Sequence, residues 1–272
     1  MQRKNDEVKN MKPKALVLTG FGINCDYETK YALELAGFSA ERLHINDLIS
    51  SPMELELYQL IAVPGGFSFG DDIASGKVLA NKLKYGLEGP LSQFIADGKL
   101  MIGICNGFQA MVKFGLLPAF GKDYRTQSAT LTFNDSGRFE DRWVYLKTNK
   151  DSKCIFTKGI GTIYLPVRHG EGKFYMDSKE KLAQLEQGGH IAFQYSDAKG
   201  IPTQAYPLNP NGSISAIAGI CDETGRIFGL MPHPEAYVHK THHPRWSREN
   251  VPEEGMGLAI FKNAAKYIQE KF

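Results

Sequence analysis

The first half of the chain repeats one pattern, in which a short apolar run is followed by a turn and then by apolar residues at helical spacing. We expect strands at residues 14–19, 41–45 and 59–63, of which the first and third are apolar runs, and a fourth run, also apolar, begins at Leu100. Between the third and fourth runs we expect a long helix and a further helical segment before Gly98. The apolar face of that long helix is formed by Val78, Leu79, Leu83 and Leu87. Strands that alternate with helices predict an α/β fold, an open and mostly parallel sheet with helices on both faces.

From about residue 126 the pattern changes to short β-like runs with few helical segments between them. Such runs predict a smaller added antiparallel sheet on the same domain. They are residues 129–133, 143–147, 163–169, 191–195, 215–220 and 227–231. A last amphipathic helix is predicted after Gly255, with an apolar face formed by Leu258, Phe261, Ala265 and Ile268.

The chain has 272 residues and contains no internal repeat or low-complexity linker. Residues 1–12 are polar and charged, so we expect a flexible N-terminal arm there. Residues 13–272 are predicted to form a single domain, whose length allows a substantial core.

Charge and cysteine usage exclude several classes of protein. The 32 basic and 30 acidic residues are nearly balanced, which gives no indication of a nucleic-acid groove or a membrane surface. No segment approaches 18 continuous apolar residues, and the N-terminus lacks the apolar region of a signal peptide. The four cysteines form no C-x-x-C pair, which favours a reducing compartment and hence the cytoplasm. They are Cys25, Cys105, Cys154 and Cys221.

Cys105 lies where the apolar run that begins at Leu100 changes into a helical pattern. Gly103 and Gly107 stand two residues before and after it, and they remove the Cβ atoms that would clash in a sharp turn. This G-x-nucleophile-x-G form is that of a nucleophile elbow, with cysteine in the place of serine. Free cysteines are more often small buried core residues, but the glycines and the strand-to-helix change favour a displayed thiol.

His233 is the best candidate for the base that such a thiol requires. It follows an apolar strand and is bracketed by Pro232 and Pro234, which fix its backbone. Glu235 is close enough to accept a hydrogen bond from the imidazole and set its tautomer. Alone, the segment could be a surface turn with a solvated carboxylate; with the elbow, it predicts a Cys-His-Glu triad.

Attack of a thiolate on an amide forms an oxyanion, which requires N–H donors held in place. One candidate is the amide of Asn106, directly after the nucleophile. The second is the turn at Gly66 and Phe67, where missing side chains let the backbone approach closely. Without the elbow, this turn would be an ordinary strand end.

Several motifs together resemble the class I (triad-type) glutamine amidotransferases and, within that class, the family of glutaminase subunits of phosphoribosylformylglycinamidine synthase. The resemblance extends over about residues 14–270. The motifs are GICNGFQ (103–109), PGGFSFGDD (64–72), MPHPE (231–235), GINCD (22–26), NDSGRFE (134–140), HGEGKF (169–174) and the closing G-x-x-I-F-K-N-A (257–264).

The resemblance implies a flavodoxin-like fold and a reaction. Glutamine would be hydrolysed through a thioester on Cys105, with His233 as base and Glu235 orienting it. The ammonia would pass to an ATP-dependent synthetase subunit that makes phosphoribosylformylglycinamidine in purine biosynthesis, often with a small third subunit. Glutamine itself would be held by Gln109, His169, Gly170 and Glu171, and Arg138 and Phe139 would face the partner.

Two other segments could be taken for ligand-binding sites, but neither fits the pattern of its site. Residues 70–78 resemble a phosphate loop, but the glycine spacing is one residue too long and Val78 replaces the serine or threonine that binds magnesium. ATP and Mg²⁺ are therefore expected on the partner, and no cofactor on this chain. His239, His242 and His243 have no acidic or cysteine ligand at a usual zinc spacing, so no metal is expected there.

Two alternative functions remain at this point. The chain could be a class I glutaminase that feeds a different acceptor synthetase. It could also be a non-enzymatic protein whose cysteine elbow senses oxidants, although MPHPE is not expected in such a protein.

Overall fold

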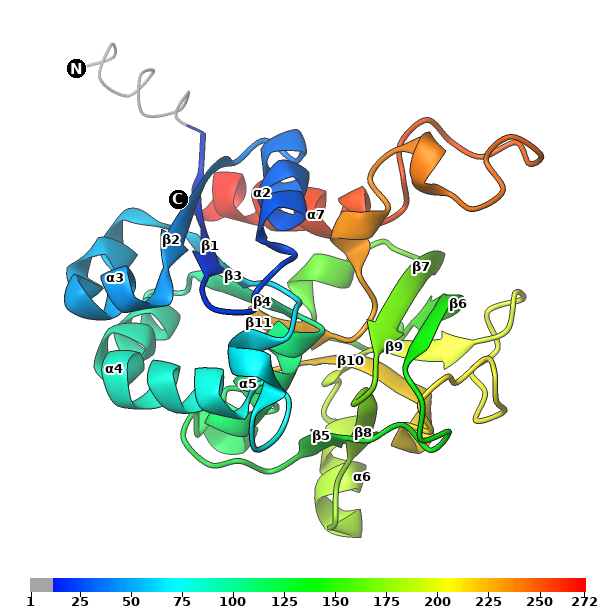
Figure 1. Ribbon diagram of the computed structural model, residues 1–272, viewed down its shortest axis with the longest axis horizontal. Helices are drawn as coiled ribbons and strands as arrows, with labels where there is room; N and C mark the ends of the chain where they lie inside the picture. The colour runs from blue at the N-terminus through cyan, green and yellow to red at the C-terminus, as the bar shows by residue number, and fades with distance from the viewer. Residues whose placement is uncertain (1–11) are drawn as a thin grey trace.

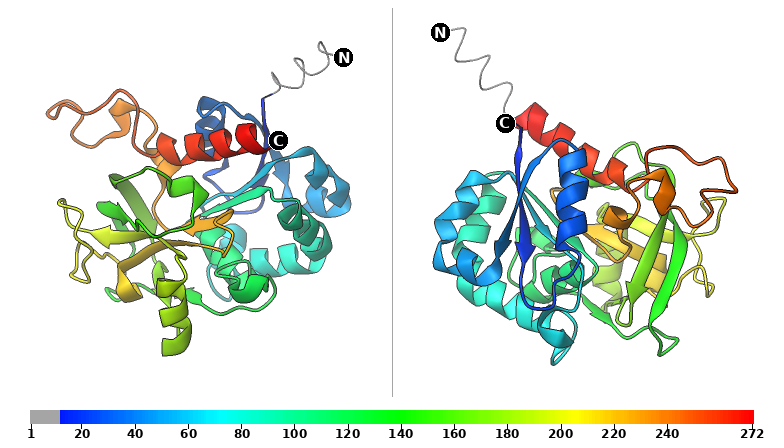
Figure 2. Two further views of the ribbon diagram at one scale, coloured as in Figure 1. Left: turned by 180° about the vertical axis from the view of Figure 1, so that it is seen from behind. Right: turned by 45° about the horizontal axis from the view of Figure 1, so that its top comes forward.

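We describe residues 12–272 of the chain from a computed structural model. A nine-stranded sheet runs through the molecule in the order β2-β1-β3-β4-β11-β10-β9-β6-β7, and a two-stranded sheet pairs β5 with β8 (Figures 1 and 2). The strands are β1 (Lys14–Thr19), β2 (Ser39–His44), β3 (Leu60–Val63), β4 (Leu100–Ile104), β5 (Thr130–Thr132), β6 (Glu140–Thr148), β7 (Thr162–His169), β8 (Lys173–Tyr175), β9 (Ile191–Ser196), β10 (Ile217–Cys221) and β11 (Ile227–Leu230).

The large sheet has two halves that differ in strand direction. From β2 to β11, neighbouring strands are parallel. From β11 to β7, each strand is antiparallel to the next. In the parallel half, β3 and β4 are buried throughout and β1 and β11 bury residues on both sides of the pleat, as expected for strands covered by helices on two faces. In β2, the edge strand, Ala40 alone is buried.

Helices cover both faces of the parallel half, as predicted. The main helices are α2 (Asp26–Leu35), α3 (Ile45–Ser50), α4 (Lys77–Ala96), α5 (Asn106–Phe114), α6 (Lys179–Gln187) and α7 (Leu258–Lys271). Figure 1 shows α2 and α7 above the sheet and α4 and α5 below it. Among residues 12–272, no helix combines the length and the apolar composition needed to cross a membrane.

The predicted α/β architecture is confirmed, with two differences in detail. The antiparallel strands mostly continue the main sheet, because β10 pairs with β11 along its edge; only β5 and β8 form a separate small sheet. The long helix and the further helical segment expected before Gly98 form one helix, α4, which contains Pro90. Pro90 removes one backbone donor, but Leu87, Leu91 and Phe94 keep the buried face continuous across it.

One hydrophobic core joins the two halves of the sheet, as a single domain of residues 13–272 would require. It includes Leu16 of β1, Phe108 of α5 and Leu165 of β7. The predicted flexible arm, residues 1–12, lies outside the described residues except for Lys12.

The parallel half brings four loops to one edge of the sheet. The chain leaves β1, β3, β4 and β11 at their carboxyl ends, and these strands are neighbours in the sheet. Ligands bind at this edge in open α/β sheets. The loops carry Cys25, Gly66, Cys105 and His233.

Candidate active site

Cys105 stands on a sharp turn between β4 and α5. Its backbone has φ 50° and ψ −106°, a conformation that costs a non-glycine residue about 1–3 kcal/mol. The flanking glycines make the turn possible: a Cβ on Gly103 would lie 2.5 Å from Met111 Sδ, and one on Gly107 would lie 1.8 Å from the carbonyl oxygen of Val63. The amide of Cys105 donates to Leu230 O of β11 at 2.8 Å. The predicted elbow is therefore present and joined to the strand that precedes His233.

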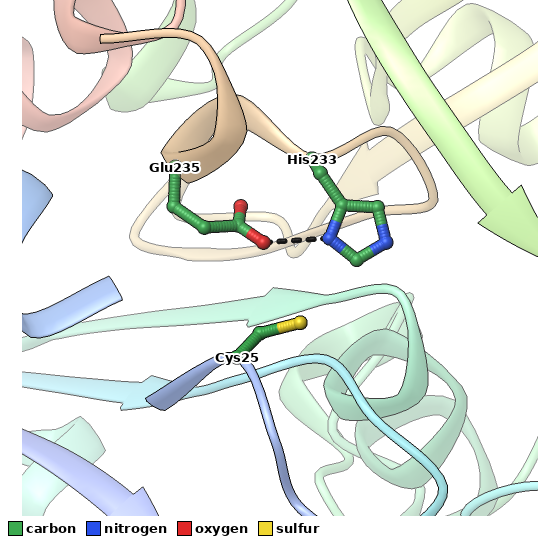
Figure 3. A group of neighbouring side chains, drawn as sticks. All are labelled: Cys25, His233 and Glu235. Carbon is green, nitrogen blue, oxygen red and sulfur yellow. Dashed lines mark hydrogen bonds and ion pairs between the residues drawn. The ribbon is translucent and has the colours of Figure 1, made fainter. Parts of the chain in front are cut away.

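His233 and Glu235 form a buried pair after β11. His233 Nδ1 and Glu235 Oε1 are 2.6 Å apart, and the residues are only 2% and 3% exposed (Figure 3). The amide of His233 donates to Pro166 O of β7 at 2.9 Å, which holds the loop against the antiparallel half. Because Ile104 and Leu230 are register partners on adjacent parallel strands, the nucleophile and the base emerge side by side.

The surroundings of His233 favour its protonated form. Burial alone disfavours a charged ring, but the carboxylate of Glu235 and the thiol of Cys105 outweigh it and raise the pKa of His233 well above its usual value. An imidazole in this position can accept a thiol proton and remain as a stabilised imidazolium. This is the electrostatic arrangement that a cysteine nucleophile requires.

The thiol and the imidazole do not yet share a hydrogen bond. Cys105 Sγ donates instead to Arg168 O at 3.6 Å, and His233 Nε2 is buried without a partner among residues 12–272. Catalytic hydrogen bonds often form only when substrate is bound. Rotation of the Cys105 side chain away from the carbonyl would allow its proton to reach Nε2.

The amides predicted to bind the oxyanion, those of Gly66, Phe67 and Asn106, differ in whether they already donate a hydrogen bond. The amides of Gly66 and Asn106 have no hydrogen-bond acceptor in the described part of the chain. The amide of Phe67 donates to Gly22 O at 2.8 Å, so it can serve an oxyanion only after that bond opens. The roles of these three amides stay predictions.

The side chain of Asn106 holds the loop that follows β3 against the elbow. Its Oδ1 accepts from the amide of Ser68 at 3.2 Å, and its Nδ2 donates to Asp71 Oδ1 at 2.9 Å. Burial raises the pKa of Asp71. The short helix η2 (Ser68–Asp71) is thereby fixed relative to α5.

The residues predicted to hold glutamine lie together around the start of α5. Gln109 Nε2 donates to Glu171 O, and Glu171 Oε2 accepts from the amide of Ser75 at 3.3 Å. Gly170 O accepts from the amide of Asn134 at 2.9 Å, which orders the loop. None of the predicted residues Gln109, His169, Gly170 and Glu171 lines the cavity at Cys105. Their contact with glutamine stays a prediction.

The ring of His169 is part of the protein interior. Nδ1 lies 3.1 Å from Asn134 Oδ1, and burial, with a smaller contribution from the charge of His233, lowers its pKa to about 3. Gly172 packs directly against the ring, where a Cβ would lie 2.3 Å from His169 Cε1. In this conformation the ring supports the loop and would not itself reach a ligand in the cavity.

The cavity at Cys105 has a volume of about 120 Å³. Its lining residues are Asn24, Cys25, Gly66, Phe67, Cys105, Phe139, Arg168 and His233. Phe139 is 53% exposed and stacks on Phe67 with 6.3 Å between ring centroids. Arg138 is exposed as well, and the contact of Arg138 and Phe139 with a partner stays a prediction.

Three residues of this site have contacts that the sequence did not indicate; for Asp71 it left open a helix cap or a partner contact. Cys25 lines the cavity, Asp71 binds Asn106, and Asn134 donates through Nδ2 to His169 O at 2.7 Å. All three belong to the quoted motifs GINCD, PGGFSFGDD and NDSGRFE, so their positions were marked. Their contacts depend on tertiary structure and could not be read from spacing.

The His239 segment stands apart from the site. His239 Nε2 lies 2.8 Å from the hydroxyl of Tyr31 on α2, and the rings of His239 and His242 are 5.4 Å apart. Among residues 12–272, the group of ligand-type side chains close enough to hold a metal ion is a different one: Cys25, His233 and Glu235.

Known proteins with similar sequences share one description. Residues 12–268 match the model of the CobB/CobQ-like glutamine amidotransferase domain. The chain is 50% identical to the phosphoribosylformylglycinamidine synthase subunit PurQ of Dehalococcoides mccartyi, over 95% of this chain and 99% of that protein. It is 43% identical to the subunit of the same name from Treponema denticola, over 95% of this chain and all of that protein.

Solved structures agree with the sequence relatives. A chain of the structure of PurLQS from Thermotoga maritima matches with a TM-score of 0.70 and 30% identity, over 95% of this chain and all of that one. A glutamine amidotransferase from the same organism matches with a TM-score of 0.52 and 15% identity, over 97% of this chain and all of that one. The second likeness shows the fold alone.

Proposed function

The chain belongs to the family of phosphoribosylformylglycinamidine synthase subunits PurQ, and we propose that it hydrolyses glutamine and delivers the ammonia to a synthetase subunit. That partner would convert formylglycinamide ribonucleotide to phosphoribosylformylglycinamidine in purine biosynthesis. The observation that carries the proposal is the buried His233–Glu235 pair, with Nδ1 and Oε1 2.6 Å apart, directly beside a cysteine elbow. Neither a core cysteine nor an oxidant sensor requires an oriented base.

The first half of the reaction follows from this geometry. The thiol proton of Cys105 moves to His233 Nε2, and Sγ attacks the carboxamide carbon of glutamine. The negative charge that develops on the amide oxygen would be stabilised by the amides of Gly66 and Asn106, which have no acceptor among residues 12–272. When the carbon–nitrogen bond breaks, the proton on Nε2 goes to the leaving nitrogen, which departs as ammonia and leaves a γ-glutamyl thioester on Cys105.

The second half uses the same groups in reverse. Nε2 of His233, now neutral, takes a proton from water, and the hydroxyl oxygen attacks the thioester carbon. Collapse of this second tetrahedral intermediate releases glutamate and returns the proton to Cys105 Sγ. In both halves, the carboxylate of Glu235 accepts from Nδ1, so that it orients the imidazole with Nε2 toward the reacting groups and stabilises the imidazolium whenever Nε2 carries the proton.

The partners follow from the family and from the chemistry. Free ammonia would be lost to water, so the site requires a synthetase subunit docked over it, with which the exposed Phe139 and Arg138 would be in contact. We assign ATP and Mg²⁺ to that subunit and no cofactor to this chain. A small third subunit and a cytoplasmic location complete the proposal, because the reaction serves nucleotide synthesis within the cell.

The test is reconstitution of the chain with the synthetase subunit from the same cell. We expect ammonia release from glutamine, and covalent labelling of Cys105 by a glutamine-analogue diazo-ketone, identified by peptide mass. Absence of both in the complex would contradict a glutaminase. Co-purification from the native cell tests the acceptor, since recovery of a different synthetase would contradict the purine assignment.

A further inference from the structure

Cys25 lies against the catalytic pair, yet the reaction above does not use it. It follows β1 and stands directly before α2, and its amide donates to Gly65 O at 3.2 Å. Cys25 Sγ, a ring nitrogen of His233 and a carboxylate oxygen of Glu235 all lie within 4.8 Å of one another. Figure 3 shows the sulfur aimed toward the imidazole. Gly65 packs between these groups, since a Cβ there would lie 2.8 Å from His233 Cε1 and 3.4 Å from Cys25 Sγ.

His233 has the arrangement of a metal-ligating histidine. Such histidines donate their second ring N–H to a carboxylate, which fixes the tautomer and makes the other nitrogen a better ligand. Nδ1 of His233 is bonded to Glu235 in this way. His233 is only 2% exposed, and its Nε2 is buried and has no hydrogen-bond partner in the described part of the chain.

Two thiols line the same cavity as this nitrogen. Cys25 and Cys105 join His233 around a volume of about 120 Å³. A donor set of two sulfurs and one imidazole suits a thiophilic divalent cation, zinc above all, with water in the fourth tetrahedral position. Zinc–sulfur bonds of about 2.3 Å and zinc–nitrogen bonds of about 2.0 Å place neighbouring donors roughly 3.5 Å apart.

We propose that Cys25, Cys105 and His233 Nε2 form a zinc-binding site that switches the glutaminase off. Binding releases the protons of both thiols and engages the nucleophile and the base together, so glutamine cannot react. Glu235 stays on Nδ1 and orients the ring. The binding claim stands on the geometry alone, whereas the inhibition rests on the proposed function.

The binding claim is tested by titrating zinc into the full chain against a chromophoric chelator, and by the absorption spectrum after cobalt substitution. We expect one equivalent of zinc per chain and a thiolate-to-cobalt charge-transfer band. Cys25→Ser and Cys25→Ala should each weaken zinc binding by about 100-fold or more, since even outer partners of a metal site contribute about 10- to 100-fold. Cys221→Ser, a matched change at a buried thiol elsewhere, should leave the affinity unchanged.

Equal zinc affinity in wild type and both Cys25 variants, with thermal unfolding midpoints that show them folded, would overturn the site. So would a cobalt complex without the charge-transfer band.

The inhibition claim is tested in the complex with the synthetase. Zinc should stop ammonia release, a chelator should restore it, and the half-inhibiting concentration should rise by about the same factor in Cys25→Ser. Undiminished turnover by zinc-loaded wild type would overturn the switch. If no partner elicits ammonia release, the proposed function fails, but the titration still decides the binding site.

Discussion

Two regions of the molecule contain a buried cysteine, a buried histidine and a carboxylate, and only one of them is arranged for chemistry. At the carboxyl ends of the parallel strands, His233 has Glu235 on Nδ1, and its Nε2 has no partner among residues 12–272 and shares a cavity with two thiols. In the antiparallel half, His190 Nδ1 lies 3.0 Å from Cys221 O, and burial lowers its pKa. The same residue types therefore give an activated base in one place and a neutral core residue in the other.

The carboxylates explain much of this difference. Asp222, next to Cys221, accepts from the amides of Arg226 and Ile227 and from the hydroxyl of Tyr124, so it closes a turn. Glu235 has one oxygen on the imidazole, and its other oxygen is buried and has no hydrogen-bond partner in the part of the chain that the structure describes. A carboxylate committed to backbone donors cannot orient an imidazole. The reactivity of such a group of residues therefore depends on the hydrogen-bond partner of each polar atom, more than on which residue types are present.

Loss of the nucleophile should have the largest effect. Cys105→Ser should lower glutaminase turnover in the complex by at least about 10⁴-fold, because an unactivated hydroxyl replaces the thiol. Cys221→Ser makes the same change at the buried cysteine of the other region, and its turnover should stay within about twofold of the wild-type value. Ammonia release measures both. Substantial activity in Cys105→Ser would remove Cys105 from the mechanism.

Removing the charge of each carboxylate should separate their roles. Glu235→Gln should lower kcat by about 10³- to 10⁴-fold, because the imidazole loses its tautomer and the stabilisation of its charged form. Asp222→Asn should leave kcat nearly unchanged and instead lower the free energy of unfolding by roughly 1–3 kcal/mol, because a buried turn loses charged acceptors. Steady-state kinetics and denaturant titration measure kcat and the free energy of unfolding of both variants. If Glu235→Gln lost stability but kept its kcat, the orienting role of Glu235 would be contradicted.

Crowding the imidazole should have an intermediate effect. In Gly65→Ala the new Cβ would lie 2.8 Å from His233 Cε1, so the ring must shift, and a displacement of that order costs about 10²-fold in kcat. Gly161→Ala is the matched control, because no atom among residues 12–272 lies within 4 Å of a Cβ there and the backbone is outside the left-handed region. Equal kcat for the two variants would show that the position of His233 tolerates displacement.

That Cys105 and His233 lie close together could be predicted from the sequence, because their proximity follows from a topological rule. Cys105 and His233 each follow a strand that reads as parallel, and carboxyl ends of parallel strands meet at one edge. The glycines around Cys105 identified the elbow because only a tight turn requires them.

Other features depend on contacts that no spacing reveals. The bond between the Phe67 amide and Gly22 O joins two loops, and it decides which amides are free. The buried position of the His169 ring depends on Asn134, 35 residues away. The continuity of α4 through Pro90 depends on the core beneath it, which outweighs the missing donor. Tertiary contacts thus determine the hydrogen-bond partners and the burial of each polar group, while the local sequence pattern determines the element on which the residue lies.

The smallest predicted effect concerns a histidine that, like His190, stays neutral in the core. The pKa of His169 is lowered from 6.5 to about 3, so between these values the unfolded chain binds a proton that the folded chain does not. Stability must then fall as the pH falls from about 6.5 toward 3, with a slope of up to about 1.4 kcal/mol per pH unit from this group. Above pH 6.5 the contribution is absent.

His169→Asn should therefore lose stability at neutral pH, through its packing and hydrogen bonds, and also show a shallower decline on acidification. Val167→Ala, a cavity on the same strand, should lower stability by a constant amount and keep the wild-type slope, because valine does not titrate. Denaturant unfolding at a series of pH values measures both quantities. Parallel curves for wild type and His169→Asn would mean that His169 is protonated in the folded protein, which its bond to Asn134 and its burial oppose.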